Sequence, residues 1–220
     1  MPPRLFAIFL FCLFPLTAQE QKHGFTFENW VLDTFFDGYR GDYTQKWDVP
    51  AEVNKINNLP ISIKTCKYGS SIGLGDIVRQ RQVSEPFILL VGFWKQSSED
   101  EKSIVAVEAM HFTPEKWNAL WGTLTLEKIQ QLDTIVKNRE INYVDAREIA
   151  KAWKDQHVPD DCQFGVHQKI GSTGQRRVQC SISFKTFWQI AGREPDPATP
   201  AILWEKTCPS SMDSKARFGE

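Results

Sequence analysis

The sequence predicts a mixed α/β fold: an α+β mixed sheet flanked by helices, with a β-hairpin in the C-terminal part. Apolar residues at helical spacing alternate with strand-like apolar runs in the order helix, strand, strand, helix, strand, strand, helices, hairpin. Hydrophobic residues make up 41% of the 220 residues, enough for a sizeable core. The order is not the regular strand–helix alternation of a dinucleotide-binding fold, and neither GxGxxG nor a P-loop motif is present.

The first twenty residues resemble a secretory signal. Arg4 precedes an apolar run from Leu5 to Leu16, and Thr17-Ala18 form a small-residue cleavage site. The run is shorter than the roughly 20 residues that a membrane span needs, so the mature form is expected to have no membrane partner. A true signal would make the protein secreted or periplasmic. A start further downstream would make it cytoplasmic.

Residues 21–207 are predicted to form one domain, with a core over 22–112 and a helical and hairpin part over 113–207. Residues 208–220 are expected to form a disordered tail. Glycines, prolines and capping residues bound the elements of the core. Those elements are a helix over 22–37, two strands over 43–49 and 59–67 that pair as a hairpin, a glycine-punctuated loop, a helix opened by Asp76, and two central strands over 87–96 and 103–112.

The C-terminal part is predicted to be largely helical. Thr113-Pro114-Glu115 has the composition of a helix start, with a capping residue and a first-position proline. The expected elements are helices from 113, over 125–138 and over 144–157, hairpin strands over 162–168 and 176–184, and a short helix over 184–190.

Charge and cysteine content restrict the classes of function. The net charge is −1, whereas a protein that only coats nucleic acid carries a strong basic excess. A nuclease stays compatible, because an acidic metal pocket and a basic groove cancel in the total. Five cysteines lack a CxxC pair, which excludes the common zinc spacings. Cys162 and Cys180 face each other across the predicted hairpin, so a disulfide is an open alternative in an oxidising compartment.

A group of charged residues follows the first predicted strands. Asp48 ends one strand, Ser62 and Lys64 share a face of the next, and Asp76 begins a helix. Phosphodiester hydrolysis needs carboxylates that hold a divalent cation, an activated water, and a positive group that offsets developing charge. We therefore predict a hydrolytic centre with Asp48 as metal ligand and Lys64 as the positive group. Lys67 replaces Lys64 if the strand register differs.

The surrounding residues resemble a known family. Lys46-Trp47-Asp48-Val49-Pro50, the later Pro60-Ile61-Ser62-Ile63-Lys64 and the opening Gly24-Phe25-Thr26-Phe27-Glu28 are similar to the PD-(D/E)XK nuclease superfamily, the fold of most type II restriction enzymes. The resemblance covers roughly residues 22–112. It implies a restriction endonuclease-like core, Mg²⁺ as cofactor, hydrolysis of double-stranded DNA to 5′-phosphate ends, and a homodimer.

One position departs from the family pattern. Ser62 stands where the D/E-x-K triplet has an acid, so one metal ligand is missing. The resemblance implies that a carboxylate on a nearby helix replaces it. Asp76 is the first candidate, and Glu28, which would join the catalytic group with Asp48, Ser62 and Lys64, is the second.

Basic and amide side chains provide candidate contacts to DNA. Arg, Lys and Gln read guanine and adenine edges in the major groove, which a two-stranded ribbon can enter. Arg79 and Gln80 follow Asp76, and Lys169, Arg176 and Arg177 lie in the predicted hairpin. The alternative is an ordinary solvated hairpin.

Two other functions stay open. The signal-like start and the potential disulfide favour a secreted or periplasmic binding or structural protein of unknown partner. A DNA-repair or defence nuclease of the same superfamily would share the catalytic residues, so only substrate assays separate it from a restriction enzyme.

Overall fold

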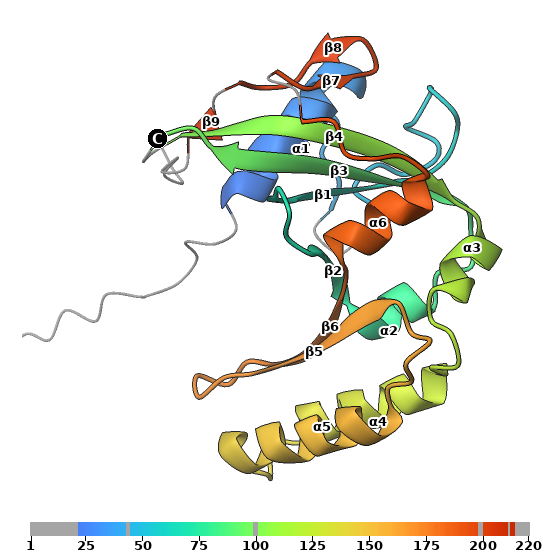
Figure 1. Ribbon diagram of the computed structural model, residues 1–220, viewed down its shortest axis with the longest axis vertical. Coiled ribbons are helices and arrows are strands. Elements are labelled where there is room, and N and C mark those ends of the chain that lie inside the picture. Colours follow the sequence, from blue (N-terminus) through green and yellow to red (C-terminus); the bar gives the residue numbers. More distant parts are fainter. Residues whose placement is uncertain (1–21, 43–44, 99–100, 198–199, 211, 214–220) are drawn as a thin grey trace, which may run out of the picture.

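The computed structural model describes residues 22–42, 45–98, 101–197, 200–210 and 212–213. The molecule is a mixed α/β structure whose mixed sheet is flanked by helices (Figure 1). Its elements are α1 (Lys22–Phe35), β1 (Ile61–Lys67), β2 (Ile72–Asp76), α2 (Ile77–Arg81), β3 (Phe87–Gln96), β4 (Glu101–Phe112), α3 (Pro114–Ala119), α4 (Leu126–Lys137), α5 (Tyr143–His157), β5 (Phe164–Ile170), β6 (Arg176–Ile182), α6 (Phe184–Ala191), β7 (Ile202–Leu203), β8 (Lys206–Thr207) and β9 (Met212–Asp213).

The larger sheet has four strands in the order β1-β3-β4-β9. β1 runs parallel to β3, whereas β3–β4 and β4–β9 are antiparallel. Helix α1 packs on one face, where Phe27 and Val31 join a buried cluster with Ile61 and Ile63 of β1. A Cβ atom at Gly92 of β3 would lie 2.8 Å from the ring of Phe27, so glycine permits the close approach of α1 to the sheet.

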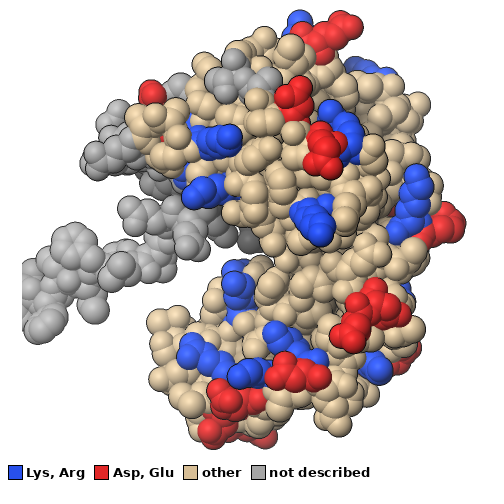
Figure 2. Space-filling view, in the orientation of Figure 1, with Lys and Arg blue, Asp and Glu red and all other residues tan. Residues whose placement is uncertain are grey.

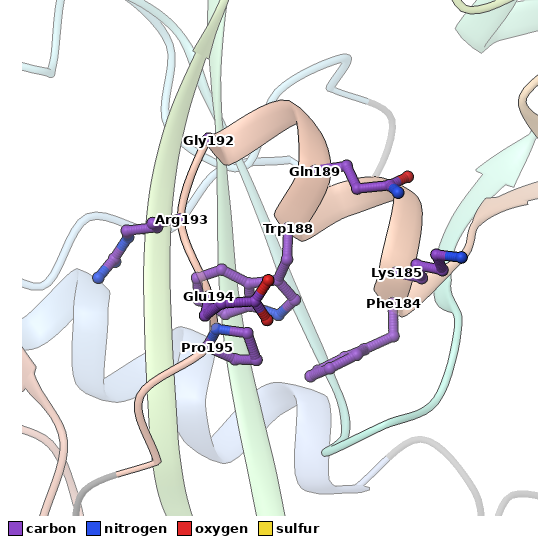
Figure 3. A pocket seen from close by; sticks show the side chains of 8 residues that line it. All are labelled: Phe184, Lys185, Trp188, Gln189, Gly192, Arg193, Glu194 and Pro195. Atoms are coloured by element: carbon purple, nitrogen blue, oxygen red, sulfur yellow. The ribbon is translucent and has the colours of Figure 1, made fainter.

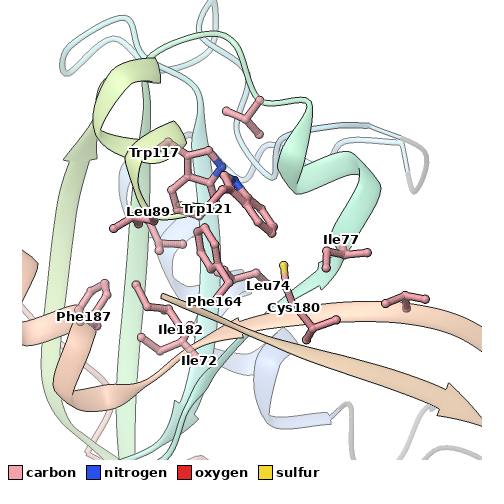
Figure 4. Close-up of a cluster of buried hydrophobic side chains, with 14 of the residues drawn as sticks. Ile72, Leu74, Ile77, Leu89, Trp117, Trp121, Phe164, Cys180, Ile182 and Phe187 are labelled. Carbon is pink, nitrogen blue, oxygen red and sulfur yellow. The ribbon is translucent and has the colours of Figure 1, made fainter. Parts of the chain in front are cut away.

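The smaller sheet is antiparallel, with three strands in the order β2-β6-β5, and the two-stranded β7–β8 sheet is separate. Helices α4 and α5 contact β5 and β6. A second buried cluster joins both larger sheets, because it includes Leu89 of β3, Trp117 of α3 and Phe164 of β5 (Figure 4). It also includes Ala146 of α5. The upper part of the molecule in Figure 1, which contains the larger sheet, and the lower part, which contains the β5–β6 hairpin with α4 and α5, therefore share one continuous apolar core.

Capping residues mark the helix starts that the sequence predicts. The side chains of Thr113, Thr125, Asn142 and Ser183 each accept a hydrogen bond from a backbone N–H in the first turn of the helix that follows. The helices expected over 22–37, 125–138, 144–157 and 184–190 are confirmed to within a few residues.

Three predicted segments are wrong. The expected strand over 43–49 is reduced to a single antiparallel bridge between Val49 and Ile61, and residues 43–44 lie outside the described part. The glycine-punctuated loop contains strand β2, which pairs with β6. Residues 208–210 and 212–213 of the expected tail contribute to the fold, because Met212 pairs with Lys102 of β4 and Cys208 is buried.

Cys162 and Cys180 both have free thiols, so the potential disulfide is not formed. Burial raises the pKa of both groups. Residues 1–20, with the signal-like segment, lie outside the described residues. Among the helices of the described part, none has the length and apolar character needed to cross a membrane.

Candidate active site at the edge of the larger sheet

Asp48 and Lys64 meet at the free edge of β1. The Oδ2 atom of Asp48 lies 3.1 Å from Nζ of Lys64 and accepts a hydrogen bond from the backbone N–H of Ile63 at 2.5 Å. The hydroxyl of Ser62 is 3.4 Å from the same oxygen. The side chains of Lys64 and Asp48 are 26% and 28% exposed, so the pair is sheltered and still accessible to a ligand. Lys64, rather than Lys67, is thus the lysine at Asp48.

Backbone pairing explains why Asp48 lies there. The bridge between Val49 and Ile61 exchanges two hydrogen bonds, of 3.1 and 2.8 Å, along the free edge of β1. Beyond the bridge the ladder stops, and the Asp48 carboxylate takes the N–H of Ile63 that a further backbone pair would have used. This interaction also has a purely structural use, because it satisfies an otherwise unpaired donor at a sheet edge.

Neighbouring side chains fix the segment that carries Asp48. Trp47 stacks on Phe87 with ring centroids 4.9 Å apart, and its indole N–H donates to Glu85 at 2.9 Å. The ammonium of Lys46 donates to the same carboxylate oxygen at 2.6 Å, and this hydrogen bond lowers the pKa of Glu85. The residues on the N-terminal side of Asp48 are therefore held against β3.

The loop between Asp48 and β1 is organised by a buried asparagine. The amide of Asn54, which is fully buried, donates to the Leu59 carbonyl at 2.7 Å and to the Asn57 side chain at 2.6 Å. Its oxygen accepts from the N–H of Ile56. These bonds close the loop, so that Asp48 meets β1 at a defined register. No motif in the sequence marked Asn54.

Glu28 of α1 lies in the electrostatic neighbourhood of the pair. Burial, followed by repulsion from Asp48, raises the pKa of Glu28, whereas the charges of Lys64 and Arg40 lower it and partly offset the rise. Glu28, the second candidate for the missing acid, therefore lies close enough to Asp48 and Lys64 for their charges to act on it. Arg40, which also donates to Asp33 at 2.9 Å, was missed because it follows the helix end without any motif.

Asp76 is the N-cap that its position at a predicted helix start indicates. Its carboxylate accepts from the N–H of Arg79 at 2.9 Å and caps α2, on the other sheet. Among the described residues no hydrogen bond or ion pair joins it to Asp48 or Lys64, and it is not among the charges that affect Glu28. No cluster of three or more His, Cys, Asp or Glu side chains that could hold a metal occurs in the described part of the chain.

The residues that the sequence predicts to contact DNA divide into two groups. Gln80 donates to the Leu74 carbonyl, Arg176 donates to the carbonyls of Val136 and Ile141, and both side chains support the fold. Arg79 is exposed, with one weak contact of 3.5 Å to the carbonyl of Gln45. Lys169 and Arg177 are exposed and lie opposite each other on the β5–β6 hairpin. Basic side chains lie on both sides of a hollow between the upper and lower parts of the molecule (Figure 2).

A cavity of about 590 Å³ lies along α6 and the segment after it (Figure 3). Arg193 on its wall is already paired with Glu108 and lies 5.3 Å from the ring of Trp188. None of the predicted catalytic residues lines this cavity. Its walls are formed by Phe184, Lys185, Trp188, Gln189, Gly192, Arg193, Glu194 and Pro195.

Comparisons with protein families, with curated proteins and with solved structures gave no match.

Proposed function

We propose that the protein is a Mg²⁺-dependent endonuclease that hydrolyses phosphodiester bonds of double-stranded DNA, of the type II restriction kind. The proposal rests on one observation. The carboxylate of Asp48 and the ammonium of Lys64 converge 3.1 Å apart at the edge of β1, with the Glu28 carboxyl near enough to repel Asp48. Two acids and one lysine around one accessible point are what metal-assisted attack on a phosphate requires.

The donor set suits Mg²⁺. This ion prefers oxygen ligands and is commonly held by one or two carboxylates together with water and substrate phosphate. All the hydrogen bonds that Asp48 makes in the described part of the chain go to Oδ2, which leaves Oδ1 available. Burial and, after it, repulsion from Asp48 raise the pKa of Glu28, and a bound cation would offset the repulsion. Asp48 and Glu28 would therefore hold the ion.

The residues of this chain have separate tasks in the proposed reaction. When bound, Mg²⁺ supplies a Lewis acid at the scissile phosphate. Lys64 has three ammonium hydrogens and uses two, one to Asp48 and one to the Ile63 carbonyl at 2.7 Å. The third can donate to a phosphate oxygen or hold the attacking water. Ser62 and the Ile63 N–H keep the Asp48 carboxylate in one orientation.

The fold is compatible with the restriction endonuclease-like core that the resemblance implies. A mixed sheet carries Lys64 on β1, helix α1 packs against that sheet and carries Glu28, and Asp48 precedes the bridge to β1. The free thiols of Cys162 and Cys180 remove one support for a secreted structural protein. Cutting both strands needs two centres, so we propose a homodimer as the active form.

Incubation of plasmid DNA with Mg²⁺ tests the proposal. We expect the wild-type protein to cleave the plasmid, and Asp48→Asn to lower the rate by about a hundredfold or more, because a positioned transition-state charge is worth that much. Asparagine keeps an oxygen for the Ile63 N–H, so the fold should persist. Asp37→Asn is the matched control, because Asp37 is nearly fully exposed and pairs only loosely with Lys55 at 3.9 Å.

Two results would contradict the proposal. One is a wild-type protein that leaves plasmid and linear duplex DNA intact over a range of Mg²⁺ concentrations. The other is cleavage that survives in EDTA or in Asp48→Asn at the wild-type rate, which would point to a contaminating nuclease or to another centre.

A further inference from the structure

The β5–β6 hairpin has one mainly apolar face and one polar face. The inner face also includes Gln168 and Arg176, and its apolar side chains are buried in the shared core, where the hairpin contacts α4 and α5; they are Phe164, Val166, Ile170, Val178, Cys180 and Ile182. Within the two strands of the hairpin the outer face has no large apolar side chain and no carboxylate; beside it, Asp76 of β2 pairs in register with Gln179 and uses its carboxylate to cap α2. The outer face consists of Gly165, His167, Lys169, Arg177, Gln179 and Ser181. Each of these residues except Gly165 has a side chain that can donate a hydrogen bond, so the face is complementary to a ligand rich in hydrogen-bond acceptors.

Two cations on this outer face stand directly opposite each other. Lys169 pairs in register with Arg177, and both are exposed. Like charges at directly opposed positions destabilise an antiparallel ribbon. Neither side chain forms a hydrogen bond or ion pair with any described residue. The fold thus keeps an unfavourable pair that a negatively charged ligand would neutralise.

The other basic residues around the hairpin donate hydrogen bonds to backbone carbonyls of the protein itself. Lys154 and Arg147 of α5 donate to the Val166 and Ile170 carbonyls at 3.0 and 2.8 Å, along the free edge of β5. Arg139 donates to the Gly174 carbonyl at the turn, at 3.1 Å. Arg176 anchors the end of α4. These bonds stiffen the ribbon and leave Lys169 and Arg177 as the cations it presents.

The ribbon is attached rigidly to the part of the molecule that carries the candidate centre. β6 pairs with β2, which contacts β1, the strand of Lys64. In Figure 1 the hairpin projects below the larger sheet, and Figure 2 shows the hollow between the two parts. A ligand held by the ribbon would therefore keep a fixed position relative to Asp48.

We infer that the outer face of the β5–β6 hairpin reads base edges in the major groove of the duplex, with Lys169, Arg177 and Gln179 as the specificity-determining residues. The inference rests on the proposed function. The major groove admits a two-stranded ribbon, Lys and Arg recognise guanine, and Gln recognises adenine. Alternate residues of a strand lie about 6.8 Å apart, which matches two base steps of about 3.4 Å each. Arg177 and Gln179 would therefore contact base pairs two steps apart.

The test compares three proteins on DNA of random sequence. They are the wild type, the double variant Lys169→Ala/Arg177→Ala, and the control Lys116→Ala/Lys151→Ala, which removes the same two charges at exposed positions outside the ribbon. The cut ends are sequenced. Affinity is measured in EDTA for a duplex that carries the wild-type target and for a scrambled duplex. Thermal unfolding checks that all three proteins are folded.

We expect the wild type and the control to share one target sequence. The ribbon variant should lose at least about tenfold in the affinity ratio of target to scrambled duplex, because each bidentate base contact contributes that much discrimination. Gln179→Ala should relax a single position of the target. An unchanged target and affinity ratio in the ribbon variant would overturn the inference, as would a loss of affinity that is equal for both duplexes, which indicates backbone contacts alone.

These outcomes separate the inference from the function on which it rests. A wild-type protein that neither binds nor cuts DNA overturns both. A wild-type protein that cuts at a defined sequence, beside a ribbon variant that cuts at the same sequence equally well, overturns the ribbon and leaves the nuclease proposal standing.

Discussion

Asp48 uses the two oxygens of its carboxylate differently. Oδ2 accepts from the Ile63 N–H, from Lys64 and from Ser62, so its orientation is set by the protein. Oδ1 has no partner among the described residues. A carboxylate held on one side loses little side-chain freedom when a cation binds on the other. In the proposed centre Ser62, whose hydroxyl lies 3.4 Å from Oδ2 of Asp48, would orient this metal ligand instead of being a ligand itself, and Glu28 would be the second acid.

The pKa of Glu28 leads to a prediction about stability. Its folded-state pKa is raised above 4.5, mainly by burial, so ionisation of this group opposes folding. The stability that the protonated group provides is fully present below about pH 4.5 and is lost as the pH rises through the raised value. Glu28→Gln should therefore melt a few degrees above the wild type at pH 7–8 in EDTA, with the difference vanishing near pH 4.

Thermal unfolding between pH 4 and pH 8 measures this difference. Glu52→Gln, at an exposed position, serves as the control and should melt close to the wild type throughout. If Glu28→Gln melts below the wild type at neutral pH, the carboxylate is stabilised by its surroundings and the repulsion from Asp48 is unimportant.

At the level of elements, local patterns predicted the helices and the long strands, whereas pairing between distant strands was harder to predict. Caps and apolar spacing are local signals, so α1, α4, α5 and the β5–β6 hairpin were expected. Strand β2 was missed because glycines at 73 and 75 hide its alternation, although Ile72 and Leu74 are buried. The parallel pairing of β1 with β3 and the division into two larger sheets depend on long-range contacts that no local pattern encodes.

The difference between local signals and long-range packing also explains which residues of the candidate site could be predicted. Asp48 and Lys64 are close in sequence and the chain turns back between them, so their meeting could be predicted from the pattern. Whether Glu28 or Asp76 joined them depended on where α1 and α2 pack. A residue in an N-cap position satisfies a local rule, and for Asp76 that local use is the one observed.

Replacement of Asp76 distinguishes a cap from a metal ligand. Asp76→Ala should cost about 1 kcal/mol of stability, as loss of an N-cap does, and lower the melting temperature by about 2–4 °C. Mg²⁺-dependent cleavage by the folded protein should stay within about twofold of the wild type. Thr113→Ala, which removes the cap of α3, is a comparison of the same kind. A folded Asp76→Ala protein without cleavage activity would show that the acid belongs to the centre.

Over the whole molecule, the shared core couples the two larger sheets. Trp117 contacts the rings of Phe87, Phe112 and Phe164, each with centroids 5.0 Å apart, and so links β3, β4 and β5. It is fully buried, and its indole N–H donates to the Gln80 carbonyl at 2.9 Å. The proposed centre on one sheet and the ribbon on the other should therefore keep a fixed separation.

This coupling predicts a single unfolding transition. The calorimetric enthalpy should equal the van't Hoff enthalpy, as expected for a two-state unit. Trp117→Ala should cost roughly 3–5 kcal/mol, the usual loss for a large buried aromatic residue, and should lower the stability of both parts together in hydrogen exchange. Two separate transitions, or loss of protection in one part alone, would contradict the continuity of the core.

The charged pair on β1 has a consequence for the behaviour of the protein in solution. Beyond the bridge with Val49, the outer side of β1 would otherwise offer unpaired backbone groups to a strand of another molecule. Asp48 accepts a hydrogen bond from the Ile63 N–H and Lys64 donates one to the Ile63 carbonyl. A strand from another molecule would therefore meet side-chain charges instead of unpaired backbone groups. A variant without both charges would expose the backbone N–H and C=O of Ile63 at the edge of β1, and would tend to aggregate through strand pairing there.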